Sequence, residues 1–475
     1  MKTAKYIIIG AMMTVISVPT MAQDATSAIE QATKIIKSGA EDKDKQVTAV
    51  FKTVKKDAKA IAGIGRAYLD AKEYDNADKY ADLAIKANKN CAAGYVLKGD
   101  ICVMKDDGGA ASSWFENATT LDPQDPEGYR RYAQINAKAD PDGSIAKLEQ
   151  LRSIDPSYPV DLVAAEIQSK AGRADAAIEY YSKVDLDKME DYQLADYAST
   201  LFLKQKYDES LKVSSFGNNK FPRYGSLNRL SLLNNVNLEK YEEAIKFGER
   251  LFNSSDDVKY TALDYINYGT ALQKLKKNDE AIKAFEKVVN TRTFDMEQRI
   301  SVFKNLSDVY KSMGDYPKAL EYYEKYVKGN QTKMTANIKN GLAQLYRTMA
   351  IDENSTPEQK QEAIAKADKV FSEIAEEFPA FKQAVTAQRA KLAFILDPED
   401  KASAAKPHYD QLIEIINGLE SKDASDVAQL KQALSYNIVY FVKVNEDIAK
   451  AKEYAAKLLE IDPENAMAKQ VADLQ

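Results

Sequence analysis

The sequence predicts an all-α fold in which antiparallel helix pairs stack one after another into a solenoid. Glycine (19) and proline (13) are scarce among the 475 residues, of which 45% are hydrophobic and 29% charged. This balance favours helices over a turn-rich β fold. A polar turn followed by a small residue recurs at a nearly constant spacing, and apolar residues beside it keep the period of one helix face. Such self-similarity indicates units that bury their apolar faces against their neighbours.

The first 22 residues have the features of an export signal. Lys2 and Lys5 precede an apolar run, 6–18, that is too short to span a bilayer. A small-x-small cleavage site ends at Ala22, so we expect the mature chain to begin at Gln23. The alternative is a retained N-terminal anchor. No later segment reaches the roughly 18 apolar residues needed to span a membrane. We therefore expect an exported protein of the bacterial periplasm, without direct membrane insertion of the mature chain.

Four parts follow from the sequence pattern. After the signal peptide, 1–22, we expect capping helices in 23–57, where two amphipathic stretches occur. A regular array of about eight repeats occupies 58–330. Less regular repeats fill 331–475 and end in a short cap helix, because the repeat pattern continues there with weaker matches.

Eight copies of the turn define the regular array. Each ends in a small residue, the marker, that opens the second helix of a pair. Successive markers are 34, 33, 33, 33, 34, 37 and 38 residues apart. The markers are Ala77, Ala111, Ser144, Ala177, Ser210, Ala244, Ala281 and Ala319. Eight ordered markers with matching neighbours argue against chance periodicity.

Two further positions repeat with the markers. Twelve residues before a marker, a small residue allows the two helices to approach closely, as at Gly65, Gly99, Ala165, Ala198, Gly269 and Ser307. Four residues after it, a bulky residue fills the pair, as at Phe115, Leu148, Tyr181, Phe285 and Tyr323. This pattern resembles the tetratricopeptide repeat, whose period is 34 residues. The resemblance implies a right-handed superhelical solenoid of about 10–11 antiparallel helix pairs.

The register loosens after residue 330. A second helix starts late, where Thr356, Pro357 and Gln359 read as an N-cap, a first-turn proline and a capping-box partner. This repeat therefore carries an insertion of about a dozen residues. A tenth unit is expected around a turn at 397–400, followed by an eleventh and by a cap helix in 466–475.

A search for chemistry finds no catalytic pattern. The sequence shows no nucleophile elbow, Walker loop or HExxH motif. Cys91 and Cys102 bracket one predicted helix, roughly 16 Å apart and beyond the reach of a disulfide. The single histidine, His408, reads as a surface or packing residue. We therefore predict no catalytic residue, no metal, no cofactor and no enzyme activity. The net charge of −6 gives no general attraction for nucleic acid.

The resemblance also implies where a partner binds. In this family the first helices of successive pairs line a concave groove that holds extended or helical peptides. Its inward positions correspond here to Tyr192, Phe202, Arg229, Leu233, Leu263, Ile266, Lys304, Lys311, Asn340, Gln344 and Arg347. The middle of this set is apolar and its end is basic and amide-rich. For each apolar member the alternative is packing against the neighbouring first helix. The family also has a clamp for a C-terminal carboxylate, which pairs a lysine with an asparagine four residues later. This clamp is absent here, because the residue four positions after Lys304 is Asp308.

Three functions of different classes remain. The first is a non-enzymatic scaffold of the bacterial envelope that binds segments of other proteins along the groove. The second is a periplasmic module that binds cell-wall glycan or a nutrient. Aromatic residues clustered on one groove face would favour it, whereas the 28 tyrosines fall largely at packing positions. The third, an enzyme with a cryptic site, has no motif in its favour.

Overall fold

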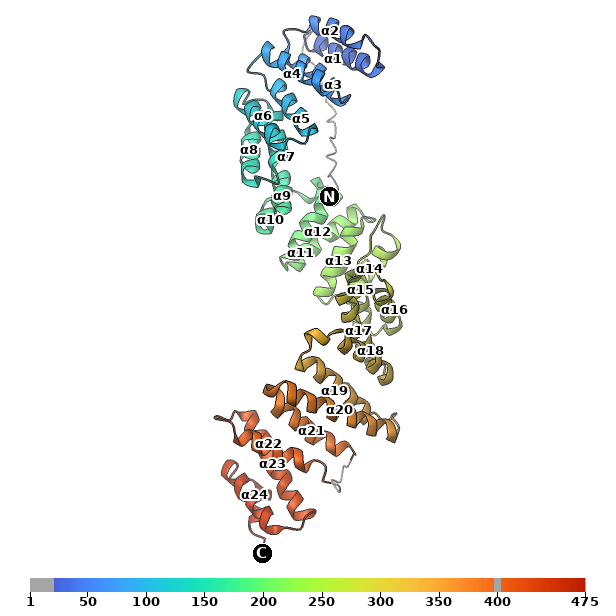
Figure 1. Cartoon of the computed structure of the whole chain (residues 1–475), viewed down its shortest axis with the longest axis vertical. Helices are drawn as coiled ribbons and strands as arrows, with labels where there is room; N and C mark the ends of the chain where they lie inside the picture. Colours follow the sequence, from blue (N-terminus) through green and yellow to red (C-terminus); the bar gives the residue numbers. More distant parts are fainter. Residues whose placement is uncertain (1–20, 397–402, 475) are drawn as a thin grey trace. The chain divides into compact units, whose positions relative to one another are not determined.

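The computed structural model describes residues 21–396 and 403–474, and the regular structure within these ranges is helical (Figure 1). They hold 25 α-helices and three short 3-10 helices and no strand. The chain divides into two compact units, Met1–Leu230 and Ser231–Gln475. The predicted signal peptide lies outside the described residues, except for Met21 and Ala22, which begin the first helix.

The first unit contains the N-terminal cap and five helix pairs. The cap consists of α1 (Met21–Ser38) and α2 (Lys43–Thr53), and α1 packs on both α2 and α3. The pairs are α3 (Ala58–Asp70) with α4 (Tyr74–Ala87), α5 (Ala92–Met104) with α6 (Gly108–Leu121), α7 (Pro126–Asn136) with α8 (Pro141–Ile154), α9 (Val160–Lys170) with α10 (Ala174–Tyr181), and α11 (Asp191–Leu203) with α12 (Tyr207–Lys220). The helices from α3 to α12 pack chiefly on the helices next to them in the chain.

The second unit continues the alternation to the C-terminus. The unit boundary falls within α13 (Gly225–Asn237), which precedes α14 (Tyr241–Asn253). The following helices are α15 (Ala262–Lys274), α16 (Asn278–Asn290), α17 (Met296–Ser312), α18 (Tyr316–Gly329), α19 (Ala336–Ile351), α20 (Pro357–Glu377), α21 (Lys382–Leu396), α22 (Lys406–Asn417), α23 (Ala424–Lys443), α24 (Ile448–Ile461) and α25 (Ala466–Ala472). From α3 to α24 the described helices form eleven pairs, and α25 is the expected cap helix.

The repeat positions occupy the core, as the spacing predicts. All eight markers from Ala77 to Ala319 have 0% of their surface exposed. Where the small position is a glycine, a side chain could not be added unless its neighbours moved. A Cβ built on Gly65 would lie 2.5 Å from Leu97 Cδ2, and one on Gly269 would lie 2.7 Å from the Phe285 ring. Both distances are shorter than a carbon contact allows, so these glycines set the separation of neighbouring helices.

One further position of the repeat is visible only in the backbone. Five residues before the marker, the turn between the two helices has a positive φ in seven of the regular copies and in the copy before Ala451. Glycine supplies it at Gly172 and Gly314. Other side chains stand there at Lys72, Asp106, Gln205, Glu239, Lys276 and Glu446, with φ between 54° and 61°. This left-handed residue ends the first helix, and it costs a side-chain-bearing residue more than glycine.

The late helix of the ninth pair begins as predicted. The backbone amide of Thr356 donates to Gln359 Oε1 (2.8 Å), and the amide of Gln359 donates to Thr356 Oγ1 (3.2 Å). This capping box and Pro357 start α20, which runs for 21 residues. The predicted turn at 397–400 lies outside the described residues.

Candidate functional site

The structure places all eleven candidate groove residues on the first helix of a pair, and none of them is fully buried. The helices concerned are α11, α13, α15, α17 and α19. The exposed members are Tyr192, Leu263, Lys304 and Lys311. The half-buried members are Phe202, Arg229, Leu233, Ile266, Asn340, Gln344 and Arg347. Their role in binding stays a prediction.

The candidate residues fall into two surfaces, because the unit boundary separates them. Tyr192, Phe202 and Arg229 belong to the first unit. Tyr192 is 52% exposed, and its hydroxyl accepts a hydrogen bond from Gln193 Nε2 at 3.1 Å. The Phe202 ring instead packs on the ring of Tyr207, with centroids 5.4 Å apart, and against the core of this unit. Tyr192 is therefore the more accessible aromatic side chain of the first surface.

The apolar part of the second surface lies on α15, which packs against α17. Leu263 is 50% exposed, whereas Ile266, one turn later, packs against the core of the second unit. Ile266 is thus a packing residue and not an accessible groove residue. Leu263 remains an accessible apolar group beside the charged residues of α17.

The cations in the charged part of this surface differ in whether they are already paired with another side chain. Lys304 Nζ forms an ion pair with Asp308 Oδ2 at 2.8 Å, which offsets its charge. Lys311 is exposed and forms no ion pair within the described part of the chain. Arg347 donates from Nη1 to Gln344 Oε1 at 3.4 Å, while its buried Nε finds no acceptor among the described residues. Lys311 is therefore the most available cation of this surface, whereas the Nε of Arg347 is buried and cannot be reached by a partner.

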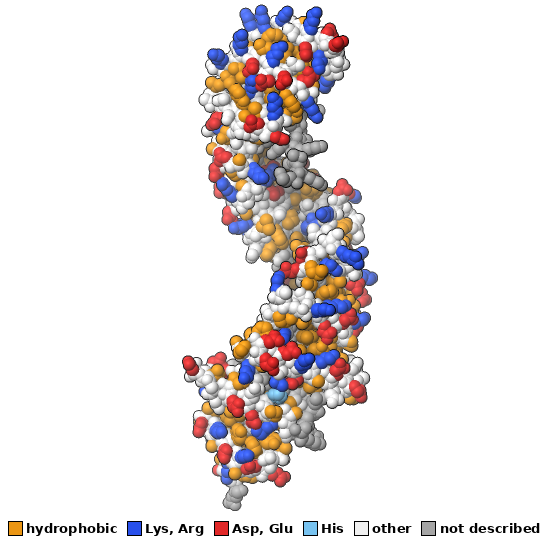
Figure 2. Space-filling view, viewed as in Figure 1, with side chains coloured by type: hydrophobic (Ala, Val, Ile, Leu, Met, Phe, Trp, Pro, Cys, Tyr) orange, Lys and Arg blue, Asp and Glu red, His pale blue; other side chains and the backbone are white. Residues whose placement is uncertain are grey.

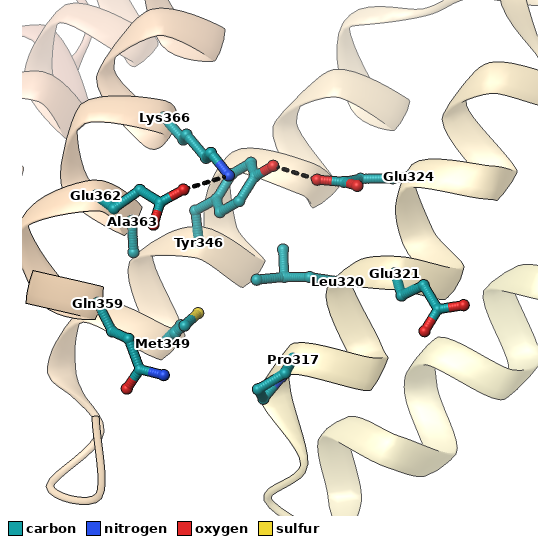
Figure 3. Close-up of a pocket in the computed structure, with 10 residues that line it drawn as sticks. All are labelled: Pro317, Leu320, Glu321, Glu324, Tyr346, Met349, Gln359, Glu362, Ala363 and Lys366. Atoms are coloured by element: carbon teal, nitrogen blue, oxygen red, sulfur yellow. Dashed lines mark hydrogen bonds and ion pairs between the residues drawn. The ribbon is translucent and has the colours of Figure 1, made fainter. Parts of the chain in front are cut away.

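A second candidate site shares only α19 with the candidate groove. The sequence pattern did not predict it, apart from the insertion that borders it. Figure 3 shows a pocket of about 250 Å³ between α18, α19 and α20. Its floor is apolar and consists of Leu320, Tyr346, Met349 and Ala363. Glutamates from α18 and α20 stand around it, at Glu321, Glu324 and Glu362, with Gln359 and Lys366. The pocket pairs an apolar floor with an acidic rim.

Two of these glutamates lie on opposite sides of the Tyr346 ring (Figure 3). The Tyr346 hydroxyl donates to Glu324 Oε1 at 2.5 Å. Lys366 Nζ pairs with Glu362 Oε1 at 2.8 Å and lies 5.6 Å from the centre of the Tyr346 ring. Burial, followed by the hydrogen bond to Glu324, raises the pKa of Tyr346 well above its usual range. Tyr346 thus stays protonated and donates to the carboxylate at neutral pH.

The rest of the described chain offers little for chemistry. Within residues 21–396 and 403–474, no group of three histidine, cysteine or acidic side chains is placed to hold a metal ion. No helix among these residues has both the length and the apolar composition to cross a membrane. His408 is half-buried on α22, and Cys91 and Cys102 are both free. Basic and acidic side chains are interspersed on the side of the molecule in Figure 2, rather than gathered by sign.

Comparison with protein families finds tetratricopeptide repeats in both units. One tetratricopeptide-repeat model matches residues 63–126, and another matches 260–332. The chain is also similar to a curated protein of Plasmodium falciparum (isolate 3D7), the pentatricopeptide repeat-containing protein 1 of the apicoplast. The two are 25% identical over 199 residues. The match covers 42% of this chain and 31% of the relative, so it spans about a third of the relative's length.

The chain is also similar to solved structures of tetratricopeptide-repeat proteins. The C-terminal part of a tetratricopeptide-repeat protein from Cytophaga hutchinsonii is 24% identical, with a TM-score of 0.46, and the match covers 59% of this chain and 100% of that one. A tetratricopeptide-repeat protein from Parabacteroides merdae ATCC 43184 is 14% identical, with a TM-score of 0.34, and the match covers 48% of this chain and 91% of that one. Proteins of this repeat type are generally non-catalytic and bind other proteins.

Proposed function

We propose that this chain, which carries tetratricopeptide repeats at 63–126 and 260–332, is a non-enzymatic interaction scaffold exported to the bacterial cell envelope. The observation that carries the proposal is the surface formed by α15, α17 and α19. It combines an exposed leucine, Leu263, with two cationic groups, the exposed Lys311 and the half-buried Arg347, and Lys311 forms no ion pair within the described residues. Apolar anchors beside charges are typical of protein interfaces, where burial supplies affinity and charge supplies orientation.

The partner segment that fits this surface is apolar at one end and acidic at the other. Leu263 takes the apolar end, which loses water-exposed surface on binding. Lys311 and Arg347 lie on the two following first helices and face the acidic end. The acidic end of the partner therefore points toward the ninth pair, α19 and α20.

A charge-reversal experiment tests this proposal. Cross-linking in cells followed by mass spectrometry supplies the partner segment. Replacement of Lys304, Lys311 and Arg347 by glutamate should weaken its binding at least tenfold and lower the salt dependence of binding. A matched triple replacement of Lys283, Lys287 and Lys328, which are exposed on second helices, makes the same change in net charge. If both triple variants bind the partner as the parent does, the groove assignment is wrong.

Export has its own test. The predicted signal peptide supports secretion, and cleavage after Ala22 would leave Gln23 as the first residue. N-terminal sequencing of the native protein and fractionation of the cell should find Gln23 first and the protein in the periplasmic fraction. An intact Met1 in the cytoplasm would contradict the envelope setting without touching the scaffold function.

Recognition of cell-wall glycan or a nutrient is the second candidate function, and one cluster of rings favours it. The Phe252 ring stacks on Tyr265 with centroids 4.7 Å apart, and Tyr260 lies 5.3 Å from Phe252. Phe294 lies 6.3 Å from Tyr265, and all four rings are half-buried, so each retains some accessible surface. Ring surfaces of this kind can pack on the apolar faces of a sugar. Calorimetric titration with soluble peptidoglycan fragments tests this function, and no binding at millimolar concentration would exclude these fragments as ligands.

A further inference from the structure

The pocket between α18, α19 and α20 is a binding site of its own. Most of its lining residues lie on the second helices α18 and α20, and only Tyr346 and Met349 come from α19, which also carries candidate groove residues. We propose that it takes an arginine side chain of a partner polypeptide, as an anchor separate from the groove. This inference goes beyond the scaffold function, because it names a second surface and the chemistry of the group bound there.

The shape of the pocket fits one long side chain. Its volume is about 250 Å³, below the range of roughly 300–1,000 Å³ for small-molecule pockets. Its floor is formed by Leu320, Met349 and Ala363 with the ring of Tyr346. An aliphatic stem can lie on this floor and lose its contact with water, while the charged head stays at the rim.

The charge of the pocket selects a cation. Three glutamates line it, against the single lysine Lys366, so the rim is net negative. Glu324 and Glu362 flank the Tyr346 ring on opposite sides (Figure 3). A planar guanidinium stacks on such a ring and donates to carboxylates at its edges, which a compact ammonium cannot do equally well. Arginine is therefore the side chain with the best match to this arrangement.

Lys366 shows that the pocket accepts a cation. Its ammonium group already pairs with Glu362 and lies over the Tyr346 ring, 5.6 Å from the ring centre. An incoming arginine must displace this ammonium group to reach the ring. Lys366 is thus a competitor that occupies the site in the absence of the partner.

The methionine methyl groups provide a direct test. Met349 lines the pocket, whereas Met296 and Met313 are exposed on α17 and directly after it. The protein labelled with ¹³C-methyl methionine is titrated with N-acetyl-arginine N-methylamide and, separately, with the uncharged citrulline analogue. Arginine should shift the Met349 signal saturably and leave Met296 and Met313 unchanged, while citrulline should give no saturable shift. Met349→Leu assigns the signal.

Two kinds of variant complete the test. The double replacement E324Q and E362Q keeps the side-chain sizes and an acceptor for Tyr346, and it should weaken arginine binding at least fivefold. Lys366→Ala removes the competitor and should strengthen arginine binding at least threefold, whereas Lys369→Ala on the same helix should have no effect. The proposal fails if Met349 does not respond to arginine, if citrulline acts equally, or if Lys366→Ala weakens binding. It also fails if putrescine binds more tightly than the arginine amide, because the pocket would then serve free polyamines.

Discussion

The hydroxyl of Ser307 donates a buried hydrogen bond to the carbonyl oxygen of Ala319, at 2.7 Å. Ala319 is a marker, and Ser307 is the small residue twelve positions before it. The same bond recurs with the roles exchanged in the fifth pair, where the marker Ser210 donates to the carbonyl oxygen of Ala198 at 2.7 Å. In these two pairs the serine thus joins the two helices at the small positions of the repeat, whereas the marker Ser144 donates instead to the carbonyl oxygen of Asp140 at the start of its own helix.

Loss of this bond should destabilise the eighth pair without disturbing its packing. Alanine fits the small position, as Ala198 shows, so Ser307→Ala removes mainly the hydrogen bond. We expect a loss of about 1 kcal/mol in the local free energy of opening. Native-state hydrogen exchange in α17 and α18 measures it. Ser301→Ala, at an exposed site on the same helix, should change this free energy by less than about 0.5 kcal/mol.

The left-handed turn residues offer a route to higher stability. Lys276 has a φ of 59° between α15 and α16, where a Cβ is strained. Lys276→Gly should stabilise this pair by about 0.5–1 kcal/mol, after allowance for the greater freedom of glycine in the unfolded chain. Lys283→Gly, in the middle of α16, should instead destabilise the pair by about 1 kcal/mol. Hydrogen exchange of α16 measures the stability change of each variant. If both replacements changed the stability in the same direction, the strain argument would be contradicted.

Two leucines on α15 should separate stability from binding. Leu272 is fully buried, whereas Leu263 is half exposed on the candidate groove. Leu272→Ala should cost roughly 2–5 kcal/mol through lost burial and a cavity. The effect should fade beyond the adjacent pairs, because each repeat contacts only its neighbours. Leu263→Ala should leave stability nearly unchanged and weaken partner binding. A stability loss spread evenly over the second unit would refute local coupling.

The single histidine should make the second unit sensitive to mild acid. Burial is the main cause that lowers the pKa of His408. The positive charge of Arg389 lowers this pKa further, and the negative charge of Asp368 opposes both effects. Below about pH 6.5 the unfolded chain takes up a proton that the folded chain resists. The free energy of unfolding therefore falls as the pH drops from about 6.5 to the lowered pKa, and is constant above that window. Denaturant titrations between pH 7.5 and 5.5 should show this decline, and His408→Gln should reduce it.

The two lysines of α17 should contribute unequally to partner binding. The Asp308 carboxylate already offsets the charge of Lys304, whereas Lys311 forms no ion pair within the described residues. Lys311→Ala should therefore weaken binding of the cross-linked partner segment more than Lys304→Ala does. Asp308→Ala should strengthen it, because it releases Lys304 and removes a repelling charge. Surface plasmon resonance at two salt concentrations measures these changes. Equal losses for the two lysine variants would contradict this account of the surface.

Much of the fold could be predicted from the sequence, because the same residue types recur at the same positions of each helix pair. The markers, the small residues twelve positions earlier and the capping box at Thr356 all act within one helix pair. Helical period and side-chain size decide such contacts, and both can be read from neighbouring positions in the chain. The assignment of the eleven groove candidates to first helices follows from the same period. This assignment depends only on which helix a residue belongs to and on which face of that helix it lies. It does not depend on the distance to another repeat.

Only the tertiary structure decided what happens between repeats. Glu324 and Tyr346 are joined by a hydrogen bond across 22 residues and two helices, and Lys366 reaches the same ring from a third. The insertion before α20 interrupts the period there, so no spacing rule places these three side chains together. The left-handed turn at Lys276 also became visible only in the backbone, although it lies within one pair. The pair of Lys304 and Asp308, by contrast, lies four residues apart on one helix, a spacing that can be read from the sequence. Periodicity determines which residues face inward, and three-dimensional packing determines which of them meet.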